Sequence, residues 1–237
     1  MKDFNIHTIG KKYKDQIYVL DELIIGETNK YRHKYDRLGG HYNIDCNMIS
    51  NCNIIRHDIG ESVSIILEEK NKARRTSVVN DIDCEFETLN EHVIERGSWA
   101  HFCYVDDMHE SHYKKINAKY ISVDFCTLTD RRAYLDIMKR ASLIFDSRER
   151  KFLYSNINIE TAIILHDQEG CECIIGGDLI YKYSQQSLPN LNVNGAGDMF
   201  AAIFIDAYLT YSLQEAINKS CKLTTGWLKN EKKIFIK

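Results

Sequence analysis

Residues 194–198 read Asn-Gly-Ala-Gly-Asp and place a carboxylate at the start of an almost wholly apolar segment. Glycines let the backbone turn tightly and approach a ligand closely. The first amides of a helix lack internal partners and lie at the positive end of its dipole, so they bind anions. Asp198 beside such a site supplies a base for a hydroxyl proton. The stretch fits phosphoryl transfer to an alcohol; a capping aspartate is the alternative that these five residues leave open.

The longer string N-V-N-G-A-G-D-M-F-A-A, which begins at Asn192, resembles the C-terminal signature D-T-x-G-A-G-D-x-F of the ribokinase/PfkB carbohydrate kinases. Asn192 and Val193 replace the usual Asp-Thr, whereas the following residues fit directly. In that family the G-A-G backbone forms an anion hole and the aspartate is the catalytic base. The resemblance therefore implies catalytic roles for Gly195, Ala196, Gly197 and Asp198, and a nucleotide contact for Asn194.

Two earlier segments resemble the parts of these kinases that bind the acceptor. In the family a glycine is followed five residues later by an aspartate that binds sugar hydroxyls, and Gly10 and Asp15 have this spacing. The string L-G-G-H-Y-N, which starts at Leu38, resembles the motif G-G-x-x-N. A surface aspartate in a lysine-rich turn and a glycine turn with a capping asparagine are the structural alternatives. The resemblance implies substrate contacts for Asp15, Gly39, Gly40, Asn43 and Arg75.

The donor side is expected at two later strand ends. Asp146 and Glu149 occupy the positions of the family's N-x-x-E motif, which organises Mg²⁺ and phosphate. Carboxylates three residues apart share one helical face, and oxygen ligands suit Mg²⁺, often through water. An exposed acidic helix start is the alternative. Gly170 fits the last glycine of the segment that borders the nucleotide. The resemblance thus implies ATP and Mg²⁺ as cofactors, bound by Asp146, Glu149, Gly170 and Asn194.

The elements that must position these residues alternate between strand and helix in the second half of the chain, which favours a parallel sheet covered on both faces. The first half is richer in strands, and Gly10 is expected to end the first of them. We expect hairpins at 62–80 and 171–184, the latter turning at Gly176-Gly177. The other expected strands are 4–10, 101–105, 119–125, 142–146 and 161–167, and the expected helices are 130–141 and two C-terminal ones.

The resemblance implies a single ribokinase-like domain over residues 1–237. Its fold class is α/β, a mostly parallel sheet flanked by helices, with a small β-strand lid drawn from about 16–27 and 62–80. The chain looks short for the family: only 35 residues separate Gly40 from Arg75, and little follows the last helix to complete an adenine pocket. Sheet edges left open in this way can be covered by a second copy of the chain, so a homodimer is expected.

The composition excludes some other classes of function. A net charge of −3 gives no general attraction to nucleic acid or to an anionic membrane. No apolar run reaches the ~18 residues that a membrane span needs, and the first residues lack the apolar core of a secretory signal. The eight cysteines form no C-x-x-C pair and are expected to be free thiols. We therefore expect a cytoplasmic protein with a small-molecule substrate.

Three functions remain, in order of preference. The first is a kinase that phosphorylates a hydroxyl of a sugar, a sugar phosphate or a related molecule, nearest the heptose-phosphate kinase-like subgroup. The second is a degenerate relative that binds a sugar or nucleotide without turnover, favoured by the shortened middle and by Leu165 and Asp167 in place of Thr and Gly. The third, an unrelated nucleotide-binding α/β protein, is disfavoured because the motifs follow one another in the family's order.

Overall fold

The described residues form one sheet of ten strands, in the order β10-β9-β8-β7-β6-β5-β1-β3-β4 with β2 paired to β1. The computed structural model describes residues 4–69, 75–80, 94, 97–114, 116–187 and 193–234. The strands of the body are β5 (Trp99–Phe102), β6 (Tyr120–Asp124), β7 (Leu143–Ser147), β8 (Ala162–Asp167), β9 (Gly170–Ile175) and β10 (Asp178–Ser184). Strands β5 to β8 run parallel, and β9 and β10 are antiparallel to their neighbours.

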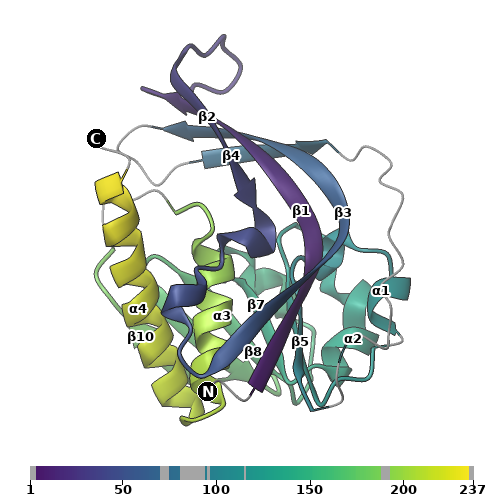
Figure 1. Ribbon diagram of the computed structural model, residues 1–237. Helices are drawn as coiled ribbons and strands as arrows, with labels where there is room; N and C mark the ends of the chain where they lie inside the picture. Colours follow the sequence, from purple (N-terminus) through teal and green to yellow (C-terminus); the bar gives the residue numbers. More distant parts are fainter. Residues whose placement is uncertain are drawn as a thin grey trace.

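Helices cover both faces of this sheet, as the alternation of strands and helices predicts. The pair α3 (Ala196–Tyr208) and α4 (Leu213–Ile234) lies on one face, and α1 (Ser111–Lys114) and α2 (Leu135–Arg140) lie on the other (Figure 1). Successive strand residues point to opposite faces, so Phe145 packs with α3 while its neighbour Ile144 packs with α2. The body is therefore an α/β sandwich with two apolar cores, and the predicted fold class is confirmed.

Two long strands leave this body and build an extension above it. Strands β1 (Phe4–Leu20) and β3 (Cys52–Glu69) are parallel along their whole length, and β2 (Tyr31–Gly39) and β4 (Arg75–Asn80) flank their upper halves (Figure 1). We call the part formed by 13–20, β2, 62–69 and β4 the lid. It overlaps the predicted lid segments, and it adds β2, a charged and largely exposed strand without apolar alternation.

The expectation that Gly10 ends the first strand is wrong. Strand β1 continues through Gly10, with a shift in its pairing to β3 between Gly10 and Lys12. The glycine packs closely against the next element, since a Cβ there would lie 3.2 Å from the Cβ of Cys103. The two hairpins are confirmed, since β3 pairs antiparallel with β4 and β9 turns into β10 through Gly176 and Gly177 at positive φ.

Two further expectations concern thiols and membranes. All seven cysteines among the described residues are free. In the same part of the chain, none of the helices combines the length and the apolar character that crossing a bilayer requires.

His101 of β5 is a buried neutral group that makes folding sensitive to pH. Its side chain is fully buried, and its Nδ1 lies 2.9 Å from the hydroxyl of Ser122. Trp99 donates to the same hydroxyl oxygen at 2.8 Å. Burial, assisted by nearby His41, lowers the pKa of His101 to about 3. The imidazole therefore stays neutral in the folded protein at pH values where it is charged in the unfolded chain.

We predict that the free energy of unfolding falls as the pH drops from about 6.5 toward 4, because His101 binds a proton in the unfolded state and stays neutral in the folded state. At pH 5 this residue alone removes about 2 kcal/mol relative to pH 7.5. Guanidinium unfolding of wild type and His101→Gln at both pH values measures this loss of stability. Between pH 7.5 and pH 5, the free energy of unfolding should fall by about 2 kcal/mol less in the variant than in wild type. His33→Gln, an exposed lid variant, is the control; equal pH dependence in wild type and His101→Gln would refute the assignment.

Candidate active site

The start of α3 brings Asp198 together with two residues from distant parts of the sequence. Asp198 lies in the first turn of the helix and is 2% exposed. Its Oδ2 accepts hydrogen bonds from the Asn43 side-chain amide at 2.9 Å and from the Tyr104 hydroxyl at 3.0 Å. Asn43 ends the 3₁₀ turn η1 (Gly40–Asn43) beneath the lid, and Tyr104 follows β5. These contacts fix the carboxylate at the carboxyl end of the parallel strands, where open α/β sheets bind ligands.

Gly195 caps α3 in the left-handed conformation, at φ 76°. A Cβ at this position would lie 2.5 Å from the carboxamide carbon of Asn43, so close packing and backbone conformation both require glycine. The Ala196 amide donates to the carbonyl of Val193 at 3.1 Å, and the Met199 amide donates to Gly195 at 3.0 Å. The amides of Gly197 and Asp198 are thus the candidate anion donors of this turn.

Gly195→Ala should lower the free energy of unfolding by about 1–3 kcal/mol and displace Asn43, because the alanine is strained at positive φ and meets the asparagine side chain. Denaturant unfolding measures the loss. Gly226→Ala is the matched control, since Gly226 lies in α4 with no heavy atom within 4 Å of an added Cβ. That substitution should be neutral or stabilising by up to about 1 kcal/mol; equal effects of the two variants would contradict the required geometry.

The predicted acceptor residues gather on the lid side of Asp198. Asp15 is 7% exposed and accepts a hydrogen bond from the Ser64 hydroxyl at 2.6 Å. Gly39 lies directly against it, because a Cβ there would be 2.2 Å from an oxygen of Asp15. Gly40, at φ 61°, packs in the same way against the ring of Tyr13. Asp15 thus contacts Gly39, and the turn from Gly39 to Asn43 ends at the residue that donates a hydrogen bond to Asp198.

Asn194 and Arg75 are the other two predicted residues near this side. The Asn194 side chain donates to Glu68 of the lid at 3.2 Å, and its carbonyl accepts a long hydrogen bond from Arg37 of β2 at 3.5 Å. Asn194 therefore contacts the lid, in addition to preceding the anion-binding turn. Arg75 begins β4 opposite Glu68, and its side chain lies outside the described residues, as does Asn192.

Tyr104 is a site residue for which the sequence gives no signal. It adopts a left-handed backbone conformation at φ 64°, and it is the only non-glycine residue with positive φ in the described part of the chain. Such a conformation costs about 1–3 kcal/mol and is commonly found at functional sites. Its ring packs edge to face on Tyr13, with ring centroids 5.9 Å apart. Burial, followed by the charge of Asp198, raises the pKa of Tyr104, so the phenol keeps its proton and donates it to Asp198.

Asp124 is a second unpredicted site residue, at the end of β6. It is 5% exposed, and burial raises its pKa well above the usual range for aspartate; the charges of Asp198 and Asp146 raise it further, whereas Arg150 lowers it. The side chain thus lies close enough to both carboxylates to sense their charges. An aspartate that directly follows an apolar strand is the signal that could have identified it, since carboxyl ends of parallel strands meet at one edge.

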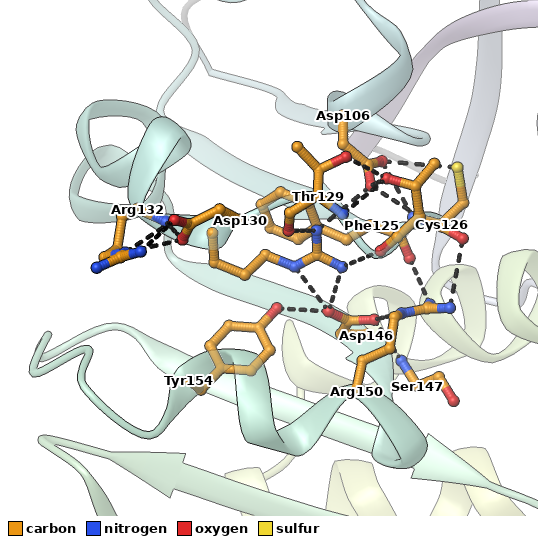
Figure 2. A network of polar contacts seen from close by, with 12 residues as sticks. Asp106, Phe125, Cys126, Thr129, Asp130, Arg132, Asp146, Ser147, Arg150 and Tyr154 are labelled. Atoms are coloured by element: carbon orange, nitrogen blue, oxygen red, sulfur yellow. Dashed lines mark hydrogen bonds and ion pairs between the residues drawn. The ribbon is translucent and has the colours of Figure 1, made fainter.

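Asp146 is placed differently from its predicted role. It is fully buried and accepts five hydrogen bonds, two from Arg131 and one each from Arg150, Tyr154 and the amide of Ser147 (Figure 2). A carboxylate offers about four lone-pair sites, so these donors occupy both oxygens. The predicted role of Asp146 as a Mg²⁺ ligand does not agree with this geometry, in which the residue is the acceptor of an arginine cluster.

The two arginines of this cluster tie several strand ends together. Arg131 is fully buried and also donates to the carbonyls of Thr127 and Thr129 at 2.7 and 2.8 Å, while its guanidinium lies over the ring of Phe125 at 4.1 Å. Arg150 donates to the carbonyls that follow β6 (Figure 2). The cluster thus fixes the loop after β6 to the end of β7.

Glu149 and Gly170 complete the predicted donor side. Glu149 is exposed in the 3₁₀ helix η6 (Arg148–Tyr154), so the buried Asp146 and the exposed Glu149 do not face one ligand as a pair. Gly170 begins β9 at φ 135°, and a Cβ there would lie 2.1 Å from the carbonyl oxygen of Tyr183. Strand pairing with β10 therefore explains this glycine. Among the described residues, no group of three or more His, Cys, Asp or Glu side chains is arranged to hold a metal ion.

Solved structures of several kinases share this architecture. The adenosine kinase of Sinorhizobium meliloti superimposes with a TM-score of 0.71 at 14% identity, over 95% of this chain and 93% of that chain. The ribokinase of Thermotoga maritima gives 0.64 at 12% identity, over 92% and 90%. A pyrophosphate-dependent kinase in the ribokinase family, solved with a pyrophosphate analogue and myo-inositol, gives 0.64 at 13% identity, over 94% and 95%.

These likenesses extend over nearly the full length of both chains. The identities of 12 to 14% show a shared fold. No protein-family model and no curated protein matches the chain.

Proposed function

We propose that this chain, which has the fold of the ribokinase-type kinases, is itself a phosphotransferase of that family and phosphorylates a hydroxyl of a small molecule. The observation that carries the proposal is the position of Asp198: a buried carboxylate in the first turn of α3, held by Asn43 and Tyr104. A carboxylate fixed beside the positive end of a helix combines a base with an anion site. These are the two parts that phosphoryl transfer to an alcohol needs.

In the proposed mechanism, the acceptor binds below the lid against Asp15, Gly39 and Asn43. The transferred phosphoryl group lies at the amides of Gly197 and Asp198, which stabilise the charge on its oxygens. Asp198 accepts the proton of the attacking hydroxyl. A weak base suffices because the transition state is loose and most of the rate comes from positioning and charge stabilisation.

The residues present fit Mg²⁺ at Asp124 rather than at Asp146. Burial raises the pKa of Asp124 and the charges of Asp198 and Asp146 raise it further, so a cation beside this carboxylate would favour its ionised form, and its hard oxygens suit Mg²⁺. Since no three-residue cluster is present among the described residues, the ion would be shared with the donor phosphates, as is usual for Mg²⁺. When bound, it would neutralise charge on those phosphates. Glu149, exposed at the start of η6, remains a candidate for contact through water.

We propose ATP as the donor and pyrophosphate as the second candidate. ATP follows from the resemblance to the carbohydrate kinases. Pyrophosphate is included because one structural neighbour is a pyrophosphate-dependent kinase. Beside β9 and β10 lies an open groove of about 310 Å³ whose polar lining includes Arg148, Glu169, Glu172 and Lys182. Arg148 pairs with Glu169 and Lys182 pairs with Glu172, so the lining is mixed in charge and differs from the apolar side chains that usually bind an adenine ring.

A protein of the same fold that binds ligands without turnover is the alternative function. A panel of sugars, sugar phosphates and nucleosides, each with Mg·ATP or Mg·pyrophosphate, separates the two. The kinase proposal expects donor consumption that depends on at least one acceptor and exceeds hydrolysis without acceptor. Ligands that raise the unfolding temperature but give no acceptor-dependent consumption with either donor would favour the binding protein.

A further inference from the structure

Arg37 of the lid strand β2 extends its guanidinium to the reaction centre. Its Nη2 donates to the side-chain oxygen of Asn43 and lies 3.5 Å from the carbonyl oxygen of Asn194. Asn43 in turn donates to Asp198, so a single carboxamide separates the guanidinium from the proposed base. The residue is half-buried, and the mechanism above gives it no role.

The charge of Arg37 is not neutralised within the part of the chain that the structure describes. Among the described residues, no carboxylate lies within ion-pair distance of Arg37, and both of its acceptors are uncharged amide oxygens. Asp15 stands directly opposite Arg37 in the register of β1 and β2, yet it accepts from Ser64 instead. By contrast, Lys11, the buried cation nearby, is paired with Asp107 at 2.8 Å.

A guanidinium carries five N–H donors in a rigid fork that matches the oxygens of phosphate and carboxylate groups. Only Nη2 of Arg37 is engaged with the described residues, so Nε and Nη1 can donate to a ligand. Two carboxylates, Asp15 and Asp198, lie in the same region and would repel an anion. The position of Arg37 therefore decides whether an anionic or a neutral acceptor is preferred.

We propose that Arg37 selects an anionic acceptor: a molecule that carries a phosphate or carboxylate group near the hydroxyl to be phosphorylated. This inference rests on the proposed function and adds the charge class of its substrate. The transferred phosphoryl group is assigned to the amides of Gly197 and Asp198 in the first turn of α3, whereas Arg37 approaches from strand β2 of the lid. The guanidinium would then hold the anionic group of an acceptor whose hydroxyl lies at Asp198.

Calorimetry without any donor tests this inference with matched pairs: ribose and ribose 5-phosphate, fructose and fructose 6-phosphate, and glucose and gluconate. Inorganic phosphate alone is a further probe. In wild type we expect an anionic member to bind at least ~10-fold more tightly than its neutral partner. Arg37→Gln should weaken that binding ~10–100-fold and leave the neutral partner unchanged, and Arg37→Lys should restore part of the loss. The pairs in which the anionic member binds more tightly show whether a phosphate or a carboxylate group is preferred.

Arg32→Gln is the control, because Arg32 lies on the same strand but is exposed and paired with Asp21 at 2.5 Å. It should leave every affinity unchanged, and matching unfolding temperatures show that both variants fold. Equal binding within the pairs, binding of no anionic member, or an unchanged affinity in Arg37→Gln would overturn the inference. Failure of the proposed function is a separate outcome. If the protein binds phosphorylated sugars through Arg37 but never transfers phosphate, this inference holds and the kinase proposal fails.

Discussion

Asp198→Asn should lower kcat for the best acceptor about 10²–10⁴-fold and change its KM only a few-fold. The asparagine oxygen can still accept the hydrogen bonds from Asn43 and Tyr104, so the geometry of the first turn of α3 is retained. The amide cannot take the proton of the attacking hydroxyl. Steady-state kinetics with saturating Mg·donor, measured over a range of acceptor concentrations, give both constants.

Asp206→Asn is the matched control, since Asp206 is a second buried aspartate in the same helix. It accepts hydrogen bonds from Ser50 and Asn51, away from the contacts of Asp198. That variant should lower stability but keep kcat when rates are divided by the folded fraction. An Asp198→Asn enzyme with wild-type kcat would show that the residue only positions Asn43 and Tyr104 and is not the base.

Asp146→Leu should destabilise the fold by about 3–5 kcal/mol, because it removes the carboxylate that pairs with two arginines. Arg131 is fully buried and would be left with a charge that only carbonyl oxygens and the more distant Asp106, at 3.4 Å, can compensate. Guanidinium unfolding gives the loss in free energy. The double variant Arg131→Met/Asp146→Leu should recover part of it, since an apolar pair replaces the stranded charge.

Asp130→Asn is the control for this cluster. Asp130 pairs with Arg132 at 2.6 Å, but both side chains are mostly exposed, so we expect little change in stability. A single variant Asp146→Leu as stable as Asp130→Asn would contradict the account of the arginine cluster. It would reopen the predicted role of Asp146 at the metal.

The order of elements in the body could be predicted from the sequence because each strand is a short apolar run with a clear boundary. The hairpin at Gly176 and Gly177 combines such runs with residues that tolerate positive φ, and its prediction is confirmed. Strand β2 could not be predicted, since its residues are charged and exposed and it is held by main-chain pairing with β1. The prediction at Gly10 failed because a glycine inside a strand looks the same in sequence as one that ends a strand.

The candidate site could be predicted in part from the sequence for a similar reason. Glycine-rich turns such as 194–198 and 39–43 carry local signals, and the structure brings Asn43 and Asp198 into contact. Tyr104 depends on where separate strands end in space, which no local pattern encodes, whereas Asp124 carries a local signal as an aspartate at the end of an apolar strand. The role of Asp146 depends on which cations reach it, and the fold brings Arg131 and Arg150 to it.

Phosphorus NMR of a donor and acceptor mixture tests the central claim most directly, because it identifies the product itself. With wild type, the account predicts a new phosphate-ester resonance on the acceptor, growing in step with the spent donor and absent with Asp198→Asn. Loss of donor to inorganic phosphate alone, or an ester that forms equally fast with Asp198→Asn, would contradict phosphoryl transfer with Asp198 as its base.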